Sequence, residues 1–151
     1  MNVSRLVAFT AVLGFCVGVL APTVDLPAQA RGPEPESGLP VVKAAEMPLY
    51  PELARSARIE GTAQMQVWTN GTSIVKVEGS GAHKLLIDAA EKNLRTWRLY
   101  PHKPISFTAT FVYSLEQVEV PGFVNPSIVL HLPTRVEIRT KQRPVEYMEM
   151  H

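Results

Sequence analysis

Histidine and cysteine are the side chains of this sequence best suited to bind a metal or to act as a nucleophile. The chain has one cysteine, Cys16, and four histidines, which are His83, His102, His131 and His151. Two ligands on one helix face need a spacing of three or four residues, and no histidine pair has it. The hydrolase nucleophile elbow and the glycine-rich phosphate loop are also absent from the sequence. We therefore expect a protein that is not an enzyme and that holds no metal and no cofactor.

The chemistry that remains is binding through the peptide backbone. Apolar and polar residues alternate from Ile105 to Leu115 more cleanly than elsewhere in the chain, which predicts a half-buried strand. The edge strand of a small sheet presents unpaired N–H and C=O groups, to which an extended peptide can add as a further strand. The formal net charge is +1 and no basic helix stands out, so we expect no nucleic-acid partner.

Residue periodicity predicts the elements that would form such a sheet. A short helix begins at Tyr50-Pro51, a strand alternates from Thr62, and Asn70-Gly71 predicts a type I′ hairpin turn. A helical period runs from Lys84 to Arg98 and precedes the strand at Ile105. We expect an α+β fold with the order α-β-β-α-β, in which about three antiparallel strands carry two helices on one face.

Three aromatic residues are placed less firmly by this pattern. Trp97 lies on the apolar stripe of the second helix, and we expect both Trp97 and Tyr100 to pack in the core. Trp68 interrupts the alternation of its strand. The sequence leaves open whether Trp68 faces solvent, faces a partner or begins the turn.

Spaced motifs in residues 47–117 resemble the C-terminal domain of TonB, the periplasmic energy transducer of Gram-negative bacteria. The motifs are Tyr50-Pro51, Arg58-Ile59-Glu60-Gly61-Thr62, Asn70-Gly71, Ala89-Ala90 and Trp97-Arg98-Leu99-Tyr100-Pro101. Among them, the positions taken as structural are Ile59, Gly61, Asn70, Gly71, Trp97, Tyr100 and Pro101. Each motif is weak alone, but their order is fairly specific.

The resemblance implies a periplasmic module that captures an extended peptide of an envelope or outer-membrane transport partner. In this family the peptide pairs with the last strand, near the Tyr-Pro helix. The matching partner-binding positions here are Met47, Pro48, Tyr50, Pro51, Val112, Tyr113, Val118 and Val120. A plain core-edge tyrosine is an equally good explanation of Tyr50. The alternative function is a structural or scaffolding envelope domain that uses the same fold without motor coupling.

Two departures from the family favour that alternative. The family's long proline-rich spacer is here a short linker, residues 31–46, and the apolar run Leu6 to Ala21 lacks the family's histidine. Coupling to the motor proteins ExbB and ExbD is therefore not expected. Residues 1–30, which end in Ala28-Gln29-Ala30, read as a secretory signal peptide or as an uncleaved inner-membrane anchor, with export to the periplasm in either case.

Residues 118–151 extend beyond the resemblance. Two short strands on either side of Pro133-Thr134-Arg135 predict a hairpin, packed either on the sheet or on a partner. Four basic residues lie here, which are Arg135, Arg139, Lys141 and Arg143. They indicate either a solvated edge protected from aggregation or a site for a lipid or anionic partner. An open sheet edge also allows a homodimer formed by strand exchange.

Overall fold

The computed structural model describes residues 38–144, so the signal or anchor segment expected in residues 1–30 lies outside it. Its helices are α1 (Glu52–Ser56) and α2 (Lys84–Leu94). Its strands are β1 (Val42–Ala44), β2 (Gly61–Thr69), β3 (Ile74–Ser80), β4 (Arg98–Leu99), β5 (Ser106–Glu119), β6 (Ser127–His131) and β7 (Arg135–Gln142). The predicted α+β class is confirmed, and α1, β2, β3, α2 and β5 follow the predicted order.

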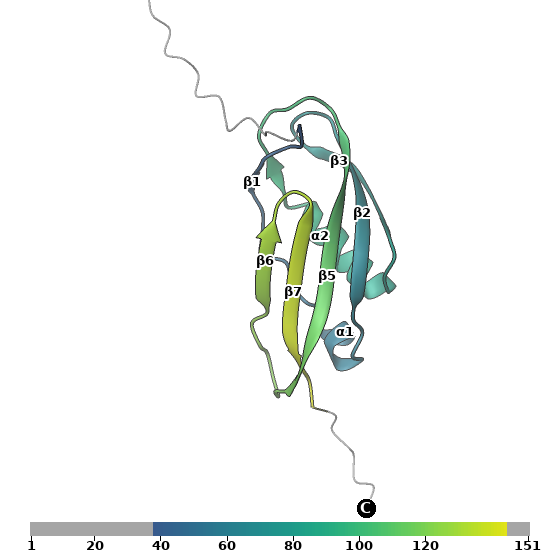
Figure 1. The fold of residues 1–151 in the computed structure, drawn as a ribbon, viewed down its shortest axis with the longest axis vertical. Coiled ribbons are helices and arrows are strands. Elements are labelled where there is room, and N and C mark those ends of the chain that lie inside the picture. The colour runs from purple at the N-terminus through teal and green to yellow at the C-terminus, as the bar shows by residue number, and fades with distance from the viewer. Residues whose placement is uncertain (1–37, 145–151) are drawn as a thin grey trace, which may run out of the picture. The chain divides into compact units, whose positions relative to one another are not determined.

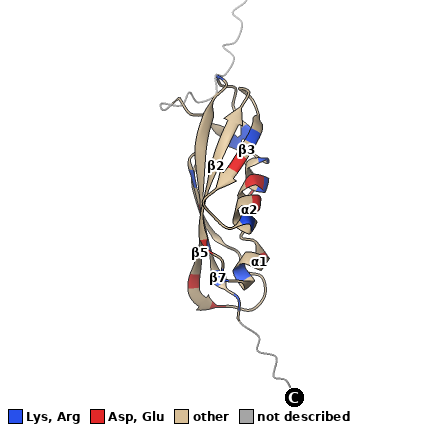
Figure 2. Ribbon diagram, turned by 90° about the vertical axis from the view of Figure 1, so that its right-hand side faces the viewer, with Lys and Arg blue, Asp and Glu red and all other residues tan. Residues whose placement is uncertain are grey.

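The main sheet has five strands in the order β3-β2-β5-β7-β6, rather than the three expected. It is also mixed, because β7 pairs with β5 in parallel while the other neighbours are antiparallel. Both helices cover the same face of the sheet, as Figure 1 and the side view in Figure 2 show. The predicted C-terminal hairpin is therefore an integral part of the sheet and not an appendage.

The predicted linker ends earlier than expected, because β1 already belongs to the fold. Val42 pairs with Leu99 of β4, and the two strands form a separate small sheet. Asn93 holds the chain that follows β1, since its side-chain amide donates to the Glu46 carbonyl at 2.8 Å. Its Oδ1 accepts a 3.0 Å hydrogen bond from the Trp97 indole. Helix α2 ends at Leu94, short of the predicted Arg98. Arg98 instead begins β4.

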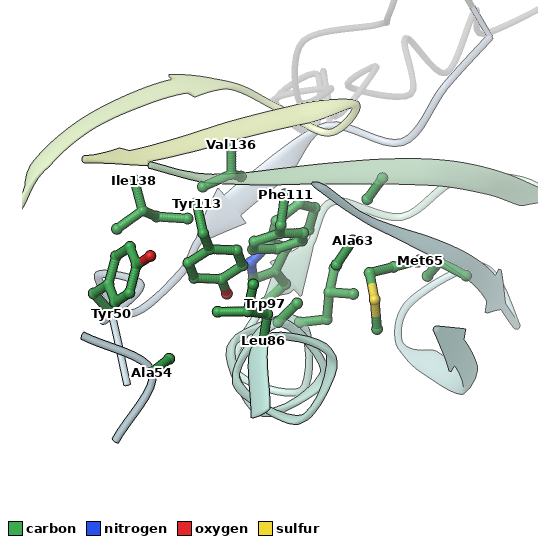
Figure 3. Packing of buried hydrophobic residues seen from close by; sticks show 14 of the residues in the cluster. Tyr50, Ala54, Ala63, Met65, Leu86, Trp97, Phe111, Tyr113, Val136 and Ile138 are labelled. Atoms are coloured by element: carbon green, nitrogen blue, oxygen red, sulfur yellow. The ribbon is translucent and has the colours of Figure 1, made fainter. Parts of the chain in front are cut away.

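The core lies between the sheet and the two helices (Figure 3). Its largest contributions from the strands come from alternate residues, which include Met65, Val67, Phe111, Tyr113, Val136 and Ile138. Leu86, Ala90 and Leu94 of α2 are fully buried against them. Trp97 is buried as predicted, with its ring 6.4 Å from that of Phe111. Tyr100 is only half-buried and lies at the surface, so its predicted core position is wrong.

The β2–β3 hairpin forms as predicted, but its turn is of another type. Thr69 pairs with Ile74, so four residues form the loop, and Asn70 does not adopt positive φ. Asn70 Oδ1 instead accepts hydrogen bonds from the backbone N–H of Thr72 and of Ser73. Gly71 has φ +103° and packs against the His102 carbonyl, where a Cβ would lie 2.7 Å from the oxygen. The loop thus closes through a side-chain cap and a glycine contact.

Trp68 continues the alternation of β2 on the face of the sheet opposite the helices. It pairs with Lys76 of β3, whose ammonium nitrogen lies 4.7 Å from the centre of the indole ring. A cation over an aromatic face is a favourable arrangement at a half-exposed site. The local contact with Lys76 explains Trp68 without a partner.

Within residues 38–144, neither helix has the length and apolar character that a membrane crossing requires.

Candidate partner-binding edge

The edge of β5 that the resemblance assigned to a partner peptide is occupied by the chain itself. Val112 pairs with Glu137 of β7, and Tyr113 pairs with Ile138. The parallel pairing continues to the far end of the strand, where Glu119 pairs with Gln142. The expectation of a free edge from Val112 to Val120 is therefore wrong. The cause is non-local, since β7 follows β5 only after the β6 strand.

Tyr50 and Tyr113 form a buried aromatic pair beneath α1 (Figure 3). Their rings meet edge to face with centres 5.5 Å apart. The Tyr50 hydroxyl donates a 2.7 Å hydrogen bond to the Ile59 carbonyl, whereas the Tyr113 hydroxyl has no partner within the described residues. Burial holds the pKa of both phenols well above the ordinary value of 10.0. Of the two explanations offered by the sequence, the core-edge tyrosine fits Tyr50.

We expect the Tyr113→Phe chain to be as stable as the unchanged chain at neutral pH, or about 1 kcal/mol more stable, because it removes an unsatisfied buried hydroxyl. The raised pKa means that the folded state keeps the tyrosine proton at a pH where the unfolded state has lost it. Stability should therefore fall as the pH rises above 10.0, and Tyr113→Phe should reduce that fall. Urea unfolding between neutral pH and pH about 11 measures both effects. Loss of stability at neutral pH would show that the hydroxyl has a hydrogen-bond partner.

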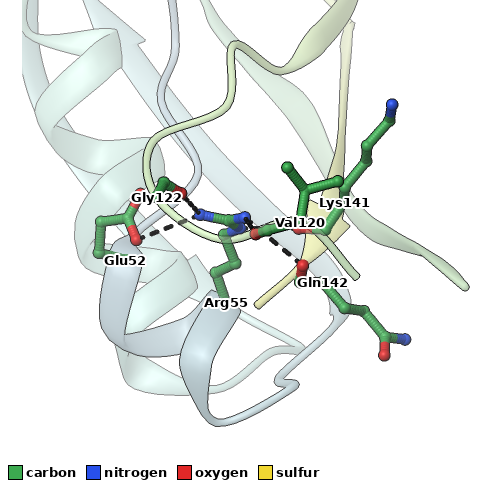
Figure 4. A network of polar contacts seen from close by, with 6 residues as sticks. All are labelled: Glu52, Arg55, Val120, Gly122, Lys141 and Gln142. Carbon is green, nitrogen blue, oxygen red and sulfur yellow. Dashed lines mark hydrogen bonds and ion pairs between the residues drawn. The ribbon is translucent and has the colours of Figure 1, made fainter. Parts of the chain in front are cut away.

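Arg55 is a residue whose role the sequence did not reveal. Its side chain is 1% exposed, and its guanidinium donates to three carbonyls, those of Lys141 at 2.7 Å, Gly122 at 2.6 Å and Val120 at 2.8 Å. Figure 4 shows this group between α1, the β5–β6 loop and the end of β7. Arg55 thereby fixes the C-terminal hairpin to the helical layer. An arginine in a short amphipathic helix gives no local signal of such burial.

The predicted partner residues of the segment before α1 differ in their exposure. Met47 is exposed, but Pro48 is buried and Pro51 is half-buried. Met47, Pro48 and Pro51 do line a hollow of about 400 Å³ against α2. At the end of β5, Val118 is exposed and Val120 is half-buried. The eight predicted positions are thus dispersed between core, hollow and strand end.

The motif positions take structural places around the sheet. Ile59 is half-buried and packs against the core, and Gly61 begins β2. Pro101 is exposed in the loop after β4, and the adjacent Tyr100 N–H donates to the Val41 carbonyl at 3.0 Å. Trp97 is in the core, while Asn70 and Gly71 close the hairpin as described above. These residues shape the fold and form no common binding site.

The outer strands β3 and β6 are the two remaining edges of the five-stranded sheet. Strand β3 carries Lys76 and Glu78, whose charged groups form a 2.7 Å ion pair, and Figure 2 shows these charges along it. Strand β6 has the sequence Ser-Ile-Val-Leu-His without any charged residue, and its Val129 and Leu130 are 45% and 43% exposed. Charged residues on edge strands discourage pairing with other chains. Strand β6 therefore has the less protected edge.

The basic residues expected to protect an edge lie instead on an interior strand. Arg135, Arg139 and Lys141 belong to β7, which lies between β5 and β6. Arg135 donates to Glu137 at 2.7 Å, and this hydrogen bond is the main cause that lowers the pKa of Glu137. The predicted edge protection is therefore wrong for these residues. The sequence placed the charges in the correct strand but could not place the strand in the sheet.

Within residues 38–144, no group of three or more histidine, cysteine or acidic side chains gathers in a way that could hold a metal ion. No family model matches the chain, and neither the curated proteins nor the solved structures contain a match to it. The geometry of the sheet edges is thus the main guide to function.

Proposed function

We propose that this chain is a protein-binding module of the cell envelope, which takes up an extended segment of a partner protein as an added strand beside β6. The observation that carries the proposal is the uncharged edge Ser127–His131 with its exposed apolar side chains. No strand lies on the outer side of β6 among the described residues. Its outward N–H and C=O groups are the groups that an extended peptide pairs with in strand addition.

The alternation of β6 defines the kind of segment that fits. Ile128 and Leu130 pair with the core residues Ile138 and Val136, so they lie on the helix side of the sheet. Val129 pairs with Glu137 and lies on the opposite side. An added strand would place every second side chain beside Ile128 and Leu130. We therefore expect partner segments that are apolar at alternate positions.

The TonB-like motifs support the same mode of binding, with the site moved from β5 to β6. The assignment to the envelope rests on the signal-like sequence of residues 1–30, which lie outside the described range. N-terminal sequencing of the protein recovered from cells tests it. We expect no catalysis and no cofactor in this function.

Selection of displayed random peptides on the immobilised full-length chain tests strand addition directly. We expect the selected peptides to alternate apolar with polar residues, because only one face of the added strand meets Ile128 and Leu130. The Val129→Lys chain should bind them at least about tenfold more weakly, since a lysine on the edge strand opposes pairing. The matched control is Val75→Lys on the other edge strand, β3, where Val75 is 59% exposed. Equal effects of the two lysines would contradict the proposal.

A pair of proline variants tests the backbone itself. Successive N–H groups of a strand point to opposite sides, so between Val129 and Leu130 one N–H faces β7 and the other faces outward. Of Val129→Pro and Leu130→Pro, only the variant that loses the outward N–H should keep the stability of the sheet. That variant should nevertheless lose peptide binding. Full binding by the stable variant would contradict pairing through the β6 backbone.

A second candidate is a scaffolding domain without peptide capture. It is favoured by the pairing of β5 with β7, which closes the edge that the resemblance assigns to a receptor peptide. The display experiment separates the candidates, because a folded chain that selects no peptide through β6 supports the scaffold.

A further inference from the structure

We infer that, without a partner segment, the β6 edge pairs with β6 of a second copy of this chain, in a two-fold antiparallel ribbon centred on Val129. This inference rests on the proposed function, because it assigns an occupant and a means of regulation to the same edge. The arrangement needs no exchange of strands, since each copy keeps its own β6 on its own β7. It differs in this from the strand-exchanged dimer that the sequence allows.

The sequence of β6 is self-complementary in this register. A two-fold axis at Val129 places Val129 opposite its own copy and Ile128 opposite Leu130 of the other copy. Ser127 then lies opposite His131. The strand contains no lysine, arginine, aspartate or glutamate, so the axis brings no like charges together.

The pairing would cover the apolar side chains that the single chain leaves exposed. Val129 and Leu130 are 45% and 43% exposed, and Ile128 is half-buried. In the ribbon, Ile128 and Leu130 of both copies would gather on the helix side, while the two Val129 side chains would meet on the other side. Removing apolar area from water favours this association.

The charges of β7 do not oppose the ribbon. Arg135 is paired with Glu137, whereas Arg139 has no ion-pair partner in residues 38–144. The β7 strands of the two copies would lie three strand spacings apart, about 14 Å. That separation exceeds the screening length of about 8 Å at physiological salt, so repulsion between them is small.

The interface between the two copies would be small, so that a partner segment could displace the second copy. Five residues per copy bury less area than the roughly 1,200 Å² of a stable complex. We therefore expect a micromolar, exchangeable dimer, not a permanent one. A partner segment would have to displace the second copy from β6. The apparent affinity of the chain for the partner segment therefore falls as the concentration of the chain rises.

Disulfide trapping at the axis tests the inference in the full-length chain with Cys16→Ser. Directly opposed residues of an antiparallel pair have Cα atoms about 4.5–5.5 Å apart, within the range that a disulfide spans. Under mild oxidation, Val129→Cys should give about tenfold more cross-linked dimer than Val75→Cys on the β3 edge. Equal cross-linking of the two cysteines would overturn the inference, because it would reflect random collision.

Sedimentation of the chain without added cysteine gives an independent measurement. The dimer fraction should rise with micromolar concentration, fall in Val129→Lys and be unchanged in Val75→Lys, with circular dichroism confirming that both variants fold. A selected peptide that binds β6 should dissociate the dimer. If peptides bind but the chain stays monomeric, the inference fails and the proposed function stands. If a dimer forms that no peptide dissociates, the proposed function and the regulatory part of the inference both fail.

Discussion

The Arg55→Met chain is expected to have a free energy of unfolding about 3–5 kcal/mol lower than that of the unchanged chain. Methionine fills a similar volume but donates no hydrogen bond. The carbonyls of Val120, Gly122 and Lys141, which Arg55 holds at 2.6–2.8 Å, would lose a charged donor in a site with little access to water. The loss should be concentrated at the C-terminal hairpin, because all three carbonyls belong to it or to the loop before it.

Urea unfolding measures the total loss, and amide hydrogen exchange locates it. We expect exchange in β7 to accelerate more than exchange in β2, which pairs with β3 and β5 and not with β7. Glu52→Gln is the control, because Glu52 is half-exposed and lies 3.6 Å from the Arg55 guanidinium. Its removal should cost under about 1 kcal/mol. A loss below that value for Arg55→Met would show that the three carbonyls find other donors.

The Gly79→Val chain is expected to be about 3 kcal/mol less stable than the unchanged chain. Gly79 lies on β3 beneath α2, and a Cβ there would be 2.3 Å from Ile87 Cγ2 and 3.0 Å from the Met65 sulfur. The Ile87 side chain, or helix α2 that carries it, would have to shift to admit any side chain at this position. Thermal and urea unfolding measure the effect.

A double-mutant cycle identifies the cause. Gly79→Ala should also destabilise the chain, and Ile87→Ala should relieve part of that loss, because it removes the Cγ2 atom that the new Cβ meets. The control on the same strand is Ser80→Val, at an exposed position, with an expected change within about 0.5 kcal/mol. Simple addition of the two single effects would rule out the Ile87 contact as the cause.

The elements were largely predictable because their signals are local. Alternation from Ile105 to Leu115 predicted β5, and the apolar stripe from Lys84 predicted α2. The two strands beside Pro133-Thr134-Arg135 were also predicted, and the structure confirms them as β6 and β7. The type I′ turn at Asn70-Gly71 was wrong, because the Asn70 side chain caps a longer loop.

The candidate site was much less predictable than the elements. The four predicted partner positions from Val112 to Val120 required β5 to have a free edge, and β7 occupies that edge. The actual outer strand, β6, was known from the sequence only as half of a hairpin. Whether a strand lies inside a sheet or at its edge depends on pairings between distant residues, which periodicity does not report.

The sequence alone determined the helices, most of the strands and their inward faces, because those follow from the period of neighbouring residues. Only the tertiary structure decided that β7 inserts between β5 and β6, that Arg55 is buried beneath the β5–β6 loop, and that the uncharged edge belongs to β6. The physical reason is the same in each case. Arg55 is buried against carbonyls that lie at least 65 residues further along the chain. Strand β7 pairs with β5 across the intervening β6 strand. No local pattern records which distant carbonyl or strand a residue will meet.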